Sequence, residues 1–135
     1  MRHALAVMLL CVSATLLRAE TVLINPALGG EALSVERVRD MLLGRVTTWK
    51  DGTAVTIILI DDGAADADLE ALVGRDRQRL LRGWKRLVYS GSGVMPQEVP
   101  SIAEAIALIA RTRGAIALIK DAPEDVRVKR VLLGK

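Results

Sequence analysis

The sequence is poor in the side chains that most catalytic and metal sites use. Its 135 residues include one cysteine, one histidine and no phenylalanine. Cys11 and His3 both lie in an apolar N-terminal segment, so the rest of the chain cannot build a Ser-His-Asp or Cys-His site, a histidine or thiolate zinc site, or an internal disulfide. We therefore expect a non-enzymatic protein without metal or cofactor. A carboxylate-centred enzyme is the catalytic alternative, and no pattern supports it.

Residues 1–19 have the pattern of an export signal. A short basic start precedes an apolar run over Ala4–Leu17, and Leu-Arg-Ala before Glu20 is a candidate cleavage site. The run is too short to span a membrane comfortably. A buried first helix and a lipoprotein anchor at Cys11 are the alternatives. The absence of a polar face disfavours the first, and the large Leu10 before the cysteine disfavours the second.

Loss of this segment changes the charge more than the length. Residues 20–135 number 116, enough for one domain with a real core. Without Arg2 and Arg18, 17 basic residues face 16 acidic ones, so the formal charge falls from +3 to +1. A balance near zero gives no support to general polyanion binding, and we expect no nucleic-acid partner.

The stretch Pro100–Lys120 holds one complete helix and one complete strand. Ser101 can cap the helix, with Glu104 placed to complete a capping box, and apolar residues then recur three and four apart. Gly114 suits the left-handed position that ends a helix. The following Ala115–Ile119 is apolar throughout, as in a strand that is covered on two faces.

Three other apolar runs predict strands over Thr21–Asn25, Ala54–Ile60 and Val126–Leu133, and the last alternates with charged residues like a half-exposed edge strand. Apolar residues at helical spacing follow the caps Ser34 and Asp76 and recur over 65–74, which predicts three helices. Asp51-Gly52 predicts a tight turn, and Ser90–Pro100 predicts a loop. Trp49 and Trp84 are expected in the core or at its rim. The order predicts an α/β domain with a small mixed sheet of about four or five strands and helices on both faces.

The succession of these cues resembles one lobe of the phosphate-type periplasmic substrate-binding proteins of ABC transporters, a type II periplasmic binding protein fold. The likeness covers nearly all of residues 20–135, and order and spacing carry it rather than any single motif. The matching elements are Asn25-Pro26, Leu33-Ser34, Leu43-Gly44-Arg45, Trp49, Asp51-Gly52, Trp84, Tyr89-Ser90-Gly91, Met95-Pro96 and Gly114-Ala115-Ile116.

The resemblance implies an exported, periplasmic binding domain that takes phosphate or another small oxyanion for a transporter, or serves as an accessory component of the envelope. No stable membrane insertion is expected after the signal is removed. The alternative is a protein-interaction module whose ligand site has degenerated, with Arg75–Arg86 or Val126–Leu133 as the contact surface.

Two loops are the candidate anion-binding groups. The first follows the strand Ala54–Ile60, where the family has a Ser-Gly-Ser-Gly-Thr-like loop at a helix N-terminus and this chain has Asp61-Asp62-Gly63-Ala64-Ala65. Carboxylates there repel a phosphate dianion, although an aspartate can accept a proton from a protonated oxyanion. The second is Ser90-Gly91-Ser92-Gly93, whose alternative is a flexible connector.

Two charged stretches have simpler interpretations. The acidic cluster between Asp61 and Glu70 lacks the ligand spacing of a calcium loop, so helix-capping aspartates explain it better than a cation site. The basic run Arg75–Arg86 is typical of a solvated helix face, with docking on an acidic protein or an anionic membrane surface as the minor alternative.

Overall fold

The computed structural model describes residues 20–28 and 32–134, so the predicted export signal lies outside the described residues. Within them, no helix combines the length and the apolar character needed to cross a bilayer. The strands are β1 (Thr21–Ile24), β2 (Thr56–Ile60), β3 (Gln97–Val99), β4 (Ala115–Leu118) and β5 (Lys129–Leu132), and the helices are α1 (Val35–Leu42), α2 (Gly63–Val73), α3 (Arg77–Tyr89) and α4 (Ile102–Arg111), with a 3-10 turn at Pro26–Leu28.

The five strands form one mixed sheet in the order β3-β2-β4-β1-β5. β2 runs parallel to both β3 and β4, whereas β1 is antiparallel to β4 and to β5. The sheet confirms the predicted fold class. Two details of the sequence analysis were wrong: β3 lies inside the expected loop Ser90–Pro100, and β5 begins at Lys129, which leaves Val126 99% exposed outside the strand.

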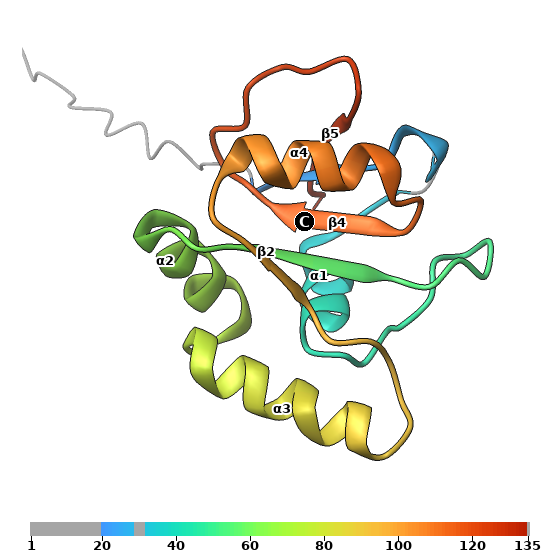
Figure 1. The fold of residues 1–135 in the computed structure, drawn as a ribbon, viewed down its shortest axis with the longest axis vertical. Coiled ribbons are helices and arrows are strands. Elements are labelled where there is room, and N and C mark those ends of the chain that lie inside the picture. The colour runs from blue at the N-terminus through green and yellow to red at the C-terminus, as the bar shows by residue number, and fades with distance from the viewer. Residues whose placement is uncertain (1–19, 29–31, 135) are drawn as a thin grey trace, which may run out of the picture.

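Helices cover both faces of the sheet, with α4 on one face and α1, α2 and α3 on the other (Figure 1). On the α4 side, Ile106 and Ile109 pack with Ile58 and Leu23 of the sheet. On the opposite side, alternate strand residues meet both tryptophans, which are 2% exposed and belong to the core as expected. Because successive side chains of a strand point to opposite faces, each covered strand contributes apolar side chains to the core on both sides of the sheet.

Side-chain caps start the helices where the sequence predicted. Ser34 accepts the N–H of Arg37 at 3.1 Å, and Ser101 accepts that of Glu104 at 3.2 Å. Asp76 does the same for α3. Each cap satisfies an N–H group that a helix leaves without an internal acceptor, so these short polar residues mark the boundaries reliably.

Gly114 has a different role from the one expected. It does not adopt a left-handed conformation, and α4 ends at Arg111, with its C-cap Thr112 in an extended conformation. A side chain at Gly114 would collide with the backbone carbonyl of Ala54, and the carbonyl of Gly114 accepts hydrogen bonds from Trp49 Nε1 at 3.0 Å and from Thr56 N at 2.9 Å. Glycine is required here because two chain segments meet with no room for Cβ.

We expect Gly114→Ala to lower the free energy of unfolding by about 2–3 kcal/mol, because the backbone of Ala54 must move to admit the methyl group. Chemical denaturation measures the change. Gly63→Ala is the matched control, since a Cβ at Gly63 meets nothing within 4 Å, and its stability should be unchanged or up to about 1 kcal/mol higher. Equal stability of the two variants would contradict the close approach.

Candidate functional site

A cleft opens at the carboxyl edge of the sheet, between the ends of the parallel strands β2 and β4. From β2 the chain passes through α2 and α3 to β3 on one side, while β4 leads toward β5 on the other, so the connections diverge at this point. Such a divergence is where open α/β sheets bind ligands. The cleft has a volume of about 120 Å³, and its lining residues are Ile60, Asp62, Ala64, Ala65, Asp68, Ile102, Leu118, Ile119, Lys120 and Asp121.

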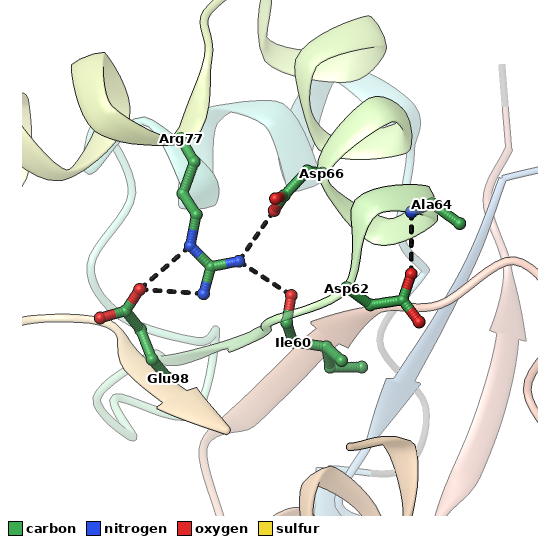
Figure 2. Close-up of polar contacts among 6 residues, drawn as sticks. All are labelled: Ile60, Asp62, Ala64, Asp66, Arg77 and Glu98. Atoms are coloured by element: carbon green, nitrogen blue, oxygen red, sulfur yellow. Dashed lines mark hydrogen bonds and ion pairs between the residues drawn. The ribbon is translucent and has the colours of Figure 1, made fainter. Parts of the chain in front are cut away.

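The N-terminus of α2 forms one wall of the cleft. Asp62 caps the helix, and its carboxylate accepts the N–H of Ala64 at 2.8 Å (Figure 2). The carbonyl of Asp62 takes the N–H of Asp66, so the N–H groups of Gly63 and Ala65 are the donors left over from the first turn. The partial positive charge of the helix end therefore faces a carboxylate from its own chain.

Lys120, just beyond β4, supplies the cation of the cleft. Its Nζ lies 2.9 Å from Asp68 Oδ1 of α2 and 3.7 Å from Glu20 Oε1 at the start of β1. The three side chains are only 21–24% exposed, so these pairs are less screened by water than surface pairs. With Asp62 and Asp121 also lining the cleft, carboxylates outnumber the single ammonium group.

Arg77 holds the neighbouring elements in place. Its Nη1 donates to the carbonyl of Ile60 and to Asp66 Oδ1, both at 2.8 Å, and its Nε donates to Glu98 Oε1 at 3.0 Å (Figure 2). One guanidinium thus connects β2, α2, α3 and β3. Burial alone would lower the pKa of Arg77, but the hydrogen bonds with Asp66 and Glu98 outweigh it and raise the pKa above its ordinary value.

This position corrects the sequence analysis, which placed Arg77 on the solvated face of its helix. The side chain is only 14% exposed, and it points toward the sheet. Charge alone did not distinguish it from its neighbours. Arg82, on the same helix, is exposed as the sequence analysis expected.

We expect Arg77→Ala to lower the free energy of unfolding by about 2–3 kcal/mol, because it leaves Asp66, Glu98 and a strand-end carbonyl without their shared donor. Thermal and chemical denaturation measure the loss. Arg82→Ala on the same helix is the matched control and should stay within about 0.5 kcal/mol of the parent chain. Equal effects of the two substitutions would refute the bracing role.

The structure does not bring the two candidate anion-binding loops together. Residues 61–65 lie at the cleft, near the start of α3, whereas Ser90–Gly93 follow its end; the 13 residues of α3 span about 20 Å. Within the second loop, Ser90 Oγ and the Ser92 N–H both donate to the carbonyl of Leu87 at 2.8 Å. These groups complete the C-terminal turn of α3.

The sequence analysis missed Lys120 and Asp121 as site residues. A usable signal was present, because both follow directly on a buried strand, and the carboxyl ends of parallel strands meet at one edge of a sheet. What the sequence did not show was which strands are parallel. Asp68 was noted only as part of an acidic cluster, and among the described residues no group of three or more His, Cys, Asp or Glu side chains is placed to hold a metal ion.

Two solved structures share this fold. An ABC-type phosphate transport receptor from Vibrio cholerae superposes with a TM-score of 0.63 at 15% sequence identity, over 84% of this chain and 45% of the receptor. A protein described as a phosphate ABC transporter substrate-binding protein from Clostridium perfringens, solved with bound phosphate, gives a TM-score of 0.62 at 16% identity, over 84% and 44% of the two chains.

The chain therefore spans less than half the length of these neighbours and has the mixed α/β fold of one part of them, as the sequence predicted. No protein-family model and no curated protein matches the sequence. At 15–16% identity the likeness establishes the fold alone.

Proposed function

We propose that this chain is an exported, substrate-binding-protein-like domain that holds a small oxyanion, with phosphate as the first choice, in the cleft between β2 and β4. The position of the cleft is the main support for the proposal. It lies where the connections from β2 and β4 leave in opposite directions, and a helix N-terminus, a lysine and two strand ends meet there. The bound phosphate of the Clostridium perfringens neighbour supports the choice of ligand. Export rests on the pattern of residues 1–19.

The carboxylates of the cleft define which oxyanion it can take. Lys120 and the N-terminal end of α2 attract an anion, whereas Asp62 and Asp121 repel one that has no proton. Phosphate near neutral pH carries at least one P–O–H group, which can donate to a carboxylate oxygen. Sulfate has no proton to offer, so the same carboxylates reject it.

We expect isothermal titration to show saturable binding of phosphate and much weaker binding of sulfate.

Asp62→Asn retains an N-cap but replaces an acceptor with an amide donor, so it should weaken phosphate binding and strengthen sulfate binding. Lys120→Met should weaken phosphate binding at least tenfold. The substitution removes the cation of the cleft and leaves Asp68 and Glu20 without a counterion, so their negative charge repels the anion.

Lys129→Met, an exposed change on β5 away from the cleft, is the charge control and should leave the affinity unchanged. Absence of saturable heat with phosphate at millimolar concentration would remove the anion proposal. Equal losses in the Lys120 and Lys129 variants would show that general charge, and not the cleft, attracts the anion.

The second candidate, a protein-interaction module, is favoured by the open edge of β5. Leu132 is 67% exposed on the strand that also carries Lys129 and Arg130, and Val126, 99% exposed, precedes that strand. The edge therefore offers unpaired backbone groups, an apolar contact and positive charge to an added strand. An acidic extended segment of a transporter or another envelope protein fits this edge.

We expect the double variant Lys129→Glu, Arg130→Glu to lose the envelope proteins that the parent chain captures, because like charge opposes an acidic strand. Quantitative pull-down from envelope extract measures the loss. The control is Arg45→Glu, Arg111→Glu, which makes the same change of charge at exposed positions outside both candidate contact surfaces. Capture unchanged by the β5 variant would exclude this edge.

A further inference from the structure

The outer face of α3 is a band of positive charge. The helix buries Leu80 and Trp84 toward the sheet. Three- and four-residue spacing places the cations together on the opposite side. We call this surface the α3 basic face; its exposed members are Arg79, Arg82, Lys85 and Arg86 of the helix, together with Arg75 just before the cap.

No carboxylate neutralises this face within residues 20–28 and 32–134, where none of its five cations forms an ion pair. Other exposed arginines are paired, such as Arg113 with Asp51 at 3.0 Å and Arg127 with Asp125 at 2.8 Å. The nearest acid in sequence, Asp76, is committed to capping the helix. The positive potential of the α3 basic face is therefore uncompensated.

Exposed apolar side chains lie at the C-terminal end of α3 and in the loop that follows it. Tyr89 is 94% exposed and follows Lys85 by four residues and Arg82 by seven, which places it in line with the cations. Val88, at 38%, precedes it in the helix, and Val94, at 58%, lies in the loop that follows. An exposed tyrosine and an exposed valine can enter the boundary between headgroups and acyl chains.

We propose that the α3 basic face docks the domain on the anionic surface of a lipid bilayer. The cations lie against headgroup phosphates, and Tyr89 and Val94 enter the interface. The helix lies on the outside of the domain, where its whole length can approach a flat surface (Figure 1). The exposed Val94 favours a bilayer over a polynucleotide, because an aliphatic side chain has no π-face on which bases stack. With Tyr89 it adds an apolar contact to the electrostatic attraction.

Vesicle co-sedimentation of the full chain tests the proposal, with phosphatidylglycerol-containing vesicles against pure phosphatidylcholine. We expect stronger partition to the anionic vesicles, weakened by added salt. Arg79→Gln, Arg82→Gln, Arg86→Gln should lower the partition coefficient by about fivefold for each cation removed. Tyr89→Ser should lower it further at high salt, where the apolar contact dominates.

The control variant Arg45→Gln, Arg111→Gln, Lys129→Gln removes three cations from other surfaces and should bind as the parent chain does. The apolar segment Ala4–Leu17 is common to every variant, so its own affinity for lipid cancels in the comparison. Three results would overturn the proposal: equal loss in the control variant, unchanged binding of the α3 variant, or a preference of the α3 basic face for an acidic protein or polynucleotide with no preference for anionic vesicles.

Discussion

The parallel pairing of β2 with β4 is the constraint on which the rest of the molecule depends. The register places Thr56 opposite Ala115 and Ile57 opposite Ile116, so the carboxyl ends of both strands reach the same edge. That edge receives both the start of α2 and the lysine beyond β4, and antiparallel pairing would place these two groups at opposite edges. The pairing in turn requires a glycine at position 114, because Ala54 approaches the chain there too closely for any side chain. Packing at one end of the strands thus determines what can meet at the other.

Most of the fold could be predicted from local patterns. The apolar runs and the helix caps contain their own boundaries, because a cap such as Ser101 and its acceptor geometry involve only a few neighbouring residues. β3 could not be predicted, since three residues between two prolines have no periodicity to recognise, and the strand exists only because β2 offers it a partner. The role of Gly114 was predicted wrongly for a related reason. Glycine is required there because Ala54, 60 positions away in the chain, leaves no room for a side chain.

The candidate site was only partly accessible to sequence reasoning. The helix start at Asp62 follows a strand and could be placed, but Lys120 joins it only once the strand order is known. Arg77 could not be placed correctly for a similar reason. Its charge predicted an exposed side chain, but Asp66 and Glu98, from two different elements, pair with it and keep it largely buried. A net charge near zero also concealed a separation of charge, with acids gathered at the cleft and uncompensated cations along α3.

The two borders of the sheet differ in how they discourage self-association. β3 is short and lies between Pro96 and Pro100, which cannot donate a backbone hydrogen bond and so prevent the border from lengthening. β5 carries Lys129 and Arg130, and two copies meeting along it would set like charges against one another. Proline at one border and like charge at the other therefore both oppose strand addition between copies of the domain.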